Sequence, residues 1–415
     1  MAAPAAQERL GLCLSGGGFR ASFYALGALR YLAEADQLER VDVVSAVSGG
    51  SIAAAALADK WTRFVAAGGS DEAFLREIDA PFRNRVTSTN LRNSWIRRSA
   101  IPFSGGRGRA LGRTLEKFLY DADRVVELPS HPQVIFTSTD LVIGRAFRIA
   151  RDFMGSWDYK YADVPDSLGL GLAVASSAAF PMSLTVVSLP TAGLGLTGAP
   201  DPLPLHDGGV YDNLGLEWFQ GWASGRPAKA LNPGFKIVAN ASGLLSKTRQ
   251  KYGAARSLLR DLSVQYAQTL NLRVRWFVDH LLAPGPTGAP RERGVYIGIG
   301  RDPRTYVDAH GKPIDPSYYA GALPSAFVEP LALLRTDLDR FLPEEADLLS
   351  YHAYWSLHAR LKTFAPSLAV PTDPQWTTYA NLSADEQRRL LAILEKGAKR
   401  KLWRRKKHKL WRWTI

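Results

Sequence analysis

The chain has 415 residues, 46% of them hydrophobic, so it is long and apolar enough to bury a large core and is not a disordered protein. Its formal net charge is +13, but ten lysines and arginines and no acid lie within residues 396–415, so the other residues carry only +3. The single cysteine, Cys13, excludes an intrachain disulfide and fits a reducing compartment.

The start of the chain, residues 1–9, has neither a basic n-region nor an apolar h-region, so we expect no secretory signal and a cytoplasmic protein. The longest uncharged window, residues 167–200, is broken by Pro181, Pro190 and several glycines. It cannot form a membrane-spanning helix, because the backbone there would lose its internal hydrogen bonds. Any membrane contact is therefore expected to be peripheral.

The first seventy residues repeat a strand and a helix. Apolar, β-branched runs at residues 10–14 and 41–47 predict strands, and helical spacing of apolar residues predicts helices over 19–35 and 51–67. This order predicts a parallel sheet with right-handed crossovers.

The rest of the chain mixes strands with helices and becomes helical past residue 301. Residues 71–121 are arginine-rich and mainly helical, with a break at 104–106. The further predicted elements are strands at 133–139, 145–149, 235–239 and 295–299, a loop at 190–205, and helices at 170–179, 256–282, 344–362 and, after a capping box of Ser383 and Glu386, 384–396. We divide the chain into a catalytic α/β domain (1–325), a helical extension packed on it (326–395) and a basic, Trp-rich tail (396–415).

Residues 41–56, V-D-V-V-S-A-V-S-G-G-S-I-A-A-A-A, have the layout of a nucleophile elbow, in which a strand, a tight turn and a helix follow one another. Ser48 stands in the turn, and its neighbours Ala46, Gly49 and Gly50 are small, as the tight turn requires. The hydroxyl would lie at a helix N-terminus, where partial positive charge favours oxyanion chemistry. Ser48 is therefore the candidate nucleophile.

The glycine triplet Gly16, Gly17 and Gly18 follows the first strand and has two interpretations. With Ala21 it fits the G-x-G-x-x-A pattern of a dinucleotide-binding turn, but that site needs an acid after the second strand, where this chain has Ser48. In a hydrolase, the two parallel strands would bring the triplet beside Ser48. The N–H groups of the triplet could then stabilise an oxyanion, and we favour this second interpretation.

Asp207 is the best candidate for the base. It is followed by Gly208 and Gly209, which leave room for the carboxylate at a sheet edge. Burial against Ser48 would raise its proton affinity enough for it to act as a base without an imidazole. None of the seven histidines stands in a recognisable motif, although His280, His310 or His352 could complete the triad of an ordinary α/β-hydrolase, which remains an alternative.

Three motifs in this order resemble the patatin-like phospholipases, which are related to the cytosolic phospholipase A2 catalytic domain. They are S-G-G-G-F-R at 15–20, A-V-S-G-G at 46–50 and D-G-G at 207–209, with weaker echoes in T-S-T-D-L at 137–141 and A-S-S-A-A-F-P at 175–181. The resemblance covers about residues 10–300. It implies a three-layer α/β/α fold with a mainly parallel central sheet, a Ser48/Asp207 dyad and an oxyanion hole of Gly16, Gly17 and Gly18.

The resemblance further implies a lipolytic serine acyl hydrolase of the phospholipase A or lysophospholipase type, acting on phospholipids or lysophospholipids through an acyl-enzyme. No cofactor is implied, and no metal is expected because no His, Asp or Glu cluster has ligand spacing. Two positions depart from the pattern: Ala46 and Ala21 stand where glycine is common, and both are small. The supporting residues implied are Arg20, Ala46, Gly49, Gly50, Gly208 and Gly209.

The tail mixes cations with tryptophans, an arrangement that favours an anionic membrane surface over simple solvation and over nucleic acid. A lipid hydrolase gains from docking where its substrate is concentrated. A non-catalytic scaffold that uses this tail remains the other alternative. The residues expected at the membrane are Lys401, Trp403, Arg404, Arg405, Lys406, Lys407, Trp411 and Trp413.

Overall fold

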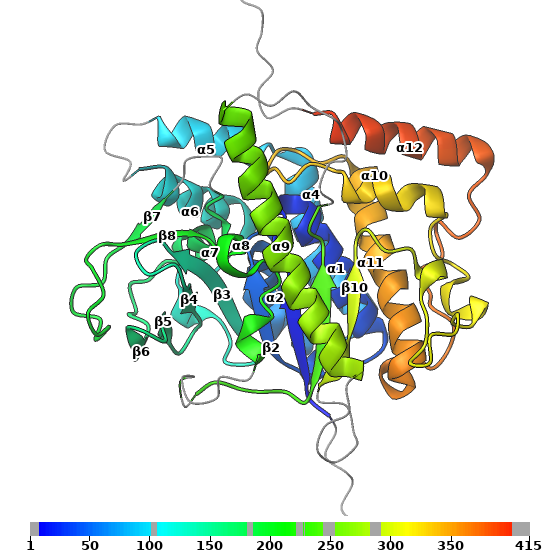
Figure 1. Ribbon diagram of the computed structural model, residues 1–415, viewed down its shortest axis with the longest axis horizontal. Helices are drawn as coiled ribbons and strands as arrows, with labels where there is room; N and C mark the ends of the chain where they lie inside the picture. The colour runs from blue at the N-terminus through cyan, green and yellow to red at the C-terminus, as the bar shows by residue number, and fades with distance from the viewer. Residues whose placement is uncertain are drawn as a thin grey trace, which may run out of the picture.

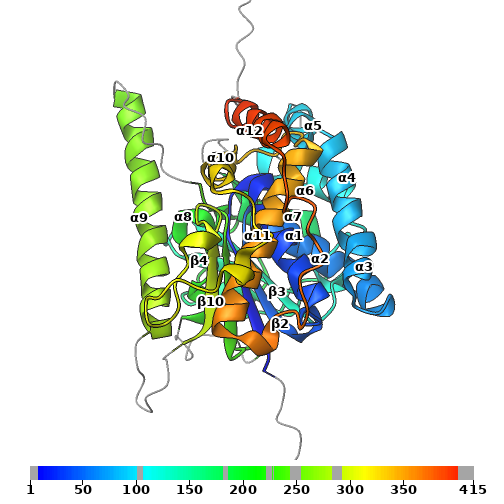
Figure 2. The same cartoon turned by 90° about the vertical axis from the view of Figure 1, so that its right-hand side faces the viewer.

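A central β-sheet lies between two layers of helices. The structure is a computed structural model that describes residues 8–100, 106–180, 186–220, 227, 229–243, 254–282 and 292–400. Seen from the side, one long helix, α9 (Ala254–Leu282), stands on one face of the sheet, while α1 (Gly18–Glu34), α2 (Gly49–Ala66) and α11 (Pro343–Phe364) cover the other (Figure 2). The three-layer α/β/α fold expected from the sequence is confirmed.

Within the described residues the sheet has ten strands, and the five on one side of it run parallel in the order β10, β9, β1, β2, β3, with β10 at the edge. The strands β4, β5 and β6 continue it antiparallel beyond β3, and β7 and β8 form an antiparallel pair attached to β3. The strand bounds are β1 Leu10–Leu14, β2 Val41–Val47, β3 Gln133–Asp140, β4 Ala146–Ile149, β5 Met154–Ser156, β6 Lys160–Ala162, β7 Val187–Leu189, β8 Leu203–Asp207, β9 Phe235–Asn240 and β10 Arg293–Gly298.

The remaining helices surround this frame (Figure 1). They are α3 (Asp71–Phe74), α4 (Ala80–Ser88), α5 (Leu91–Ser99), α6 (Gly106–Leu119), α7 (Leu170–Ala178), the short α8 (Gly209–Asp212), α10 (Val328–Ala332) and α12 (Ala384–Ala398). In the part of the chain that the structure describes, no helix is long and apolar enough to cross a membrane.

The first β-α-β-α unit is confirmed, and so is the capping box, in which Ser383 and Glu386 bond each other's backbone N–H. Helix α2 begins at Gly49, two residues before the predicted start, because the turn is a single residue long. The predicted loop over 190–205 is wrong at its end, where Leu203 to Leu205 belong to β8. Part of the predicted break, residues 104–105, lies outside the described residues.

The core continues from the sheet into the C-terminal helices. Leu12 of β1, Leu331 of α10, Leu348 of α11 and Leu394 of α12 belong to one buried cluster on the same face of the sheet. The opposite face carries a second cluster that includes Cys13 of β1 and extends to α9. Burial raises the pKa of the Cys13 thiol, which therefore behaves as a small apolar side chain.

Candidate active site

Ser48 occupies the turn between β2 and α2. Its φ of 52° and ψ of −117° lie in a region that non-glycine residues seldom adopt. Such strain costs about 1 to 3 kcal/mol and persists only where the surroundings enforce it. Here the surroundings are close backbone contacts, since a Cβ on Gly49 would lie 1.9 Å from the Gly18 carbonyl oxygen and one on Gly50 2.3 Å from that of Leu14. The strand, one-residue turn and helix of an elbow are therefore present.

Ala46, where the family pattern has glycine, fits the elbow. It lies in β2 between Leu14 of β1 and Phe136 of β3, and its side chain is completely buried. The methyl group thus packs into the main core without disturbing either strand pairing.

Ser177 of α7 braces the elbow from the side. Its hydroxyl donates to the Thr137 carbonyl oxygen at 2.6 Å, accepts the Ser48 N–H at 2.9 Å and lies 2.8 Å from the Ser51 hydroxyl. With its proton used on Thr137, Ser177 has two lone pairs left, one for the Ser48 amide and one for the Ser51 hydroxyl. The two weaker sequence echoes, at 137–141 and 175–181, thus support the turn.

The register of the sheet brings Asp207 to Ser48. Val47, the last residue of β2, pairs with Thr137 of β3, and Asp207, the last residue of β8, pairs antiparallel with Ser138. At Ser138 one edge of β3 pairs with β4, so β8 must pair with the opposite edge. This is the same edge that pairs with β2 as far as Thr137. The two strands therefore meet end to end, with Ser48 and Asp207 at the junction.

Asp207 is held tightly in this position. Its N–H donates to the Ala179 carbonyl oxygen at 3.1 Å, its carbonyl oxygen accepts from the Thr139 hydroxyl at 2.8 Å, and its Oδ1 accepts from the Gly209 N–H at 2.8 Å. A side chain at Gly208 would meet the Thr137 carbonyl oxygen at 2.0 Å, so the residue after Asp207 must be glycine.

Burial raises the pKa of Asp207 from 3.8 to about 6, and the Ser48 hydroxyl and the Gly209 N–H oppose this rise because they stabilise the carboxylate. Oδ2 of Asp207 is buried and has no hydrogen-bond partner among the described residues. The group is ionised at neutral pH yet far more basic than an exposed aspartate, which suits a general base.

We expect Asp207→Asn to raise the free energy of unfolding at about pH 8 by about 2 to 3 kcal/mol. The folded state binds the Asp207 proton more tightly than the unfolded chain does, so wild-type stability falls as pH rises from about 4 through about 6. Urea unfolding at about pH 8 and pH 4 measures this, with the exposed Asp373→Asn as the matched control. An equal effect of Asp207→Asn at both pH values would contradict the assignment.

The glycine loop lies against the elbow, since a Cβ on Gly16 would be 3.1 Å from the Ser48 Cβ. The Gly16 N–H donates to the Asn213 carbonyl oxygen at 3.0 Å, so this amide is not free for the oxyanion role predicted for it. Gly17 and Gly18 have φ values of 142° and 56°, and no acceptor within the described residues faces their N–H groups. The oxyanion role therefore remains a prediction for these two amides.

Arg20 holds the loop from beneath. Its buried guanidinium donates to the carbonyl oxygens of Ala241 at 3.1 Å, Ala332 at 3.2 Å and Leu334 at 2.6 Å, and burial lowers its pKa to about 10. It is only 3% exposed, and its hydrogen bonds to described residues go to carbonyls rather than to an acid. This contact pattern makes Arg20 a structural support.

Two polar side chains, those of Asn213 and Tyr266, lie beside Asp207. A Cβ on Gly209 would lie 2.5 Å from the Asn213 Oδ1 and 2.8 Å from both the Tyr266 hydroxyl of α9 and the Asp207 Oδ1. Burial, and then the Asp207 carboxylate, raise the pKa of Tyr266, which keeps its hydroxyl protonated. In the sequence, Tyr266 is one of the apolar positions of a helical stripe, and nothing there distinguishes it.

The histidines of the alternative triad have other partners. Nε2 of His352 lies 3.0 Å from the Ile299 carbonyl oxygen and Nδ1 of His280 lies 2.8 Å from that of Trp276, while His310 is exposed in a turn after Asp308. Burial lowers the pKa of His352 to about 4, so it stays neutral. Among the described residues, no three potential metal ligands come together. The predicted membrane residues, from Lys401 to Trp413, lie outside the described residues.

Comparison with known proteins identifies residues 12–218 as matching the patatin-like phospholipase family. No curated protein matches the chain. Among solved structures, human GIVD cytosolic phospholipase A2 matches with a TM-score of 0.48 and 12% identity, over 87% of this chain and 60% of that one. The same human enzyme in complex with methyl γ-linolenyl fluorophosphonate inhibitor and terbium chloride matches with a TM-score of 0.46, 14% identity and the same coverages. The chain thus spans less than two thirds of these structures.

Proposed function

The chain is a member of the patatin-like phospholipase family over residues 12–218, and on this basis we propose that it is a lipolytic serine acyl hydrolase. Its substrates are the carboxylic esters of phospholipids or lysophospholipids. The observation that carries the proposal is the end-to-end meeting of β2 and β8 on β3, which leaves a strained serine beside a buried, proton-attracting carboxylate.

The reaction uses few groups. Asp207 takes the Ser48 proton as the hydroxyl oxygen attacks the ester carbonyl, and the amides of Gly17 and Gly18 stabilise the oxyanion. The alcohol leaves with the proton from Asp207, giving an acyl-enzyme. Asp207 then takes a proton from water, whose oxygen attacks the acyl carbonyl, and it returns this proton to the Ser48 oxygen as the acid is released. The N-terminus of α2 adds a favourable dipole at the reacting oxygen.

The test is a lipid panel assayed with purified protein. We expect release of free fatty acid from at least one phospholipid or lysophospholipid, and none from the Ser48→Ala variant. No release from any ester by the wild type, with no labelling by a fluorophosphonate, would favour the non-catalytic scaffold. Activity that a histidine substitution abolishes would favour the triad.

We also propose that the basic tail docks the enzyme on anionic lipid, in peripheral association with the membrane. The position of Gly397, near the end of α12, supports this. Its carbonyl oxygen contacts the Arg335 guanidinium at 3.5 Å, and Thr336, which follows Arg335, lies against Gly18 of the glycine loop. The tail therefore leaves the described part of the chain close to the catalytic edge.

Deleting residues 401–415 should weaken binding to vesicles containing phosphatidylserine at least about tenfold, because each cation near the surface contributes about 1 kcal/mol. Sedimentation with vesicles measures this, and vesicles of neutral lipid serve as the control. Hydrolysis of a soluble ester should be unchanged. Equal binding by the full and shortened chains would refute docking through the tail.

A further inference from the structure

The glycine loop is backed by a segment that lies far outside the family match. A Cβ on Gly18 would lie 2.7 Å from both the carbonyl carbon and the carbonyl oxygen of Thr336, and the Phe19 N–H donates to the Asp337 carbonyl oxygen at 3.3 Å. The two residues that follow Gly17 therefore rest directly on backbone from the loop between α10 and α11. We call residues 332–342 the strap.

The strap is tied to its surroundings by three arginines from different places in the chain. From the inside, Arg20 of α1 donates to the carbonyl oxygens of Ala332 and Leu334. From the outside, Arg92 of α5 forms an ion pair with the Asp337 carboxylate, and its N–H donates to the Leu338 carbonyl oxygen at 2.9 Å. The third arginine, Arg335, belongs to the strap itself.

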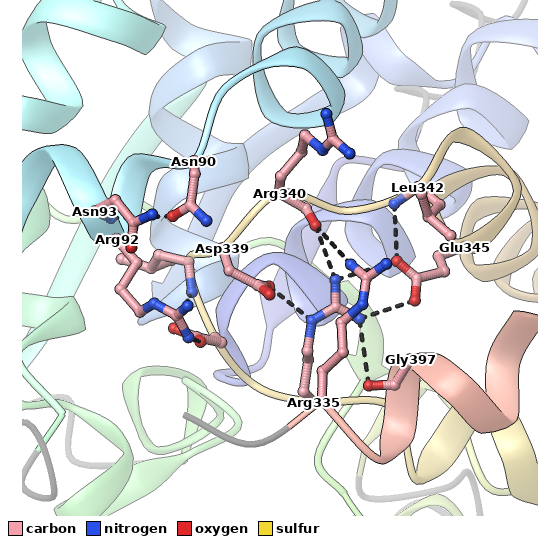
Figure 3. Close-up of polar contacts among 12 residues, drawn as sticks. Asn90, Arg92, Asn93, Arg335, Asp339, Arg340, Leu342, Glu345 and Gly397 are labelled. Atoms are coloured by element: carbon pink, nitrogen blue, oxygen red, sulfur yellow. Dashed lines mark hydrogen bonds and ion pairs between the residues drawn. The ribbon is translucent and has the colours of Figure 1, made fainter. Parts of the chain in front are cut away.

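Arg335 lies at the centre of a buried polar network (Figure 3). Its guanidinium donates to Asp339 Oδ1 at 2.6 Å, to both carboxylate oxygens of Glu345 at 2.8 and 3.1 Å and to the Arg340 carbonyl oxygen at 3.0 Å. The Arg335 and Glu345 side chains are 6% and 0% exposed. The network closes the strap into a loop and fixes it to the start of α11, where Glu345 also accepts the Leu342 N–H.

A second contact leads from the same guanidinium to the glycine loop. Arg335 lies over the ring of Phe341, with its carbon 4.0 Å from the ring centroid, and Phe341 packs edge-on against Phe19 at a centroid distance of 6.3 Å. Arg335 thus reaches the loop both through its backbone neighbours, Thr336 and Asp337, and through the edge-to-face pair of Phe341 and Phe19. Gly17 and Gly18 have positive φ values, and glycine backbone can adopt many other conformations, so we infer that the backing of Gly18 and Phe19 restricts where the N–H groups of the loop point.

We propose that Arg335 is a positioning residue for the oxyanion loop, and that the strap in the C-terminal region completes the active site of the domain matched over residues 12–218. This inference rests on the proposed hydrolase function. A loosened strap would let Gly18 shift. Misplaced N–H donors would then stabilise the oxyanion of the transition state less, while substrate binding in the ground state would change little. The expected signature is a loss in kcat with little change in KM.

The test uses the full chain and a soluble ester, p-nitrophenyl butyrate. Arg335→Met alone would leave the Asp339 and Glu345 carboxylates buried without the guanidinium that pairs with them. The main variant is therefore the charge-free Arg335→Met/Asp339→Asn/Glu345→Gln, in which none of these three charges is left over. Arg335→Lys, which keeps the charge but loses the forked geometry, is the second variant. We expect kcat to fall at least about tenfold in both, with KM changed less than about twofold.

The matched control is Arg304→Met. Arg304 makes a similar set of bonds in the same region, to Asp302 and to the carbonyl oxygens of Leu323 and Ala322, but lies in a different loop from the strap. A trifluoromethyl ketone, whose hemiketal adduct with Ser48 would place an oxyanion in the hole, should lose affinity in parallel with kcat in the Arg335 variants only. Unchanged kcat in a folded Arg335 variant, or an equal loss in Arg304→Met, would overturn the proposal. An inactive wild type would instead refute the proposed function.

Discussion

We expect Ser48→Ala to lower the rate of ester hydrolysis by at least about four orders of magnitude while the protein stays folded. In the proposed mechanism the hydroxyl oxygen forms the covalent bond to the acyl group, and in serine hydrolases the loss of the nucleophile leaves only the contributions of binding and the oxyanion hole. The substitution also removes no packing of consequence, because the elbow is held by backbone contacts and by the Ser48 N–H bond to Ser177, which alanine keeps. The measurement is kcat/KM on a soluble ester.

Ser45→Ala is the matched control. Ser45 lies three residues earlier, in β2, is completely buried, and its hydroxyl has no partner among the described residues. We expect this variant to retain activity within about threefold, since a small, unpaired hydroxyl in a strand takes no part in the chemistry. Asp207→Asn should resemble Ser48→Ala, because the amide keeps the Gly209 bond but cannot accept a proton. Full activity in either dyad variant would refute the dyad.

Gly49→Ala should destabilise the protein by about 3 kcal/mol or more, the upper part of the range for overpacked sites. The added Cβ would lie 1.9 Å from the Gly18 carbonyl oxygen and 2.8 Å from the Gly18 nitrogen, both of them backbone atoms that no rotamer change can move. This steric clash can be relieved only if the elbow and the glycine loop move apart. Any protein that remains folded should therefore lose at least about a hundredfold in kcat, because a small misplacement of the catalytic groups costs that much.

Gly234→Ala is the control for this effect. Its Cβ would meet only the flexible end of Glu8, at 3.4 Å, and neither glycine has a positive φ, so the two substitutions differ mainly in the space available. Urea unfolding and kcat are measured for both. Equal midpoints of unfolding for Gly49→Ala and Gly234→Ala would show that the close approach of the loop to the elbow is not present.

The elbow and the glycine loop could be predicted from the sequence because each is encoded locally. A strand, a small-residue turn and a helix follow one another within sixteen residues of 41–56, and the first strand leads directly into Gly16. Parallel pairing of β1 with β2 then brings the two turns together without further information. Asp207 was singled out in the sequence because Gly208 and Gly209 follow it, and in the structure a side chain at position 208 would meet the Thr137 carbonyl oxygen.

What escaped prediction depends on contacts between distant residues. The strand β8 contains Pro204 and His206 and reads as loop, and it becomes a strand only because the free edge of β3 beyond Val47 accepts it. The strap has no motif at all, since its role comes from meeting Gly18 more than three hundred residues away in sequence. Tyr266 fits an apolar helical stripe in the sequence, although in the structure a Cβ on Gly209 would lie 2.8 Å from both its hydroxyl and the Asp207 Oδ1.

The most direct test of the Ser48/Asp207 dyad is to label the protein with a fluorophosphonate and to locate the adduct by mass spectrometry. We predict one adduct, on Ser48, that forms in parallel with the loss of hydrolysis, is absent in Ser48→Ala and forms at least about a thousandfold more slowly in Asp207→Asn. An adduct on another serine that accompanies the loss of hydrolysis, or full hydrolysis by protein whose Ser48 is modified, would contradict it.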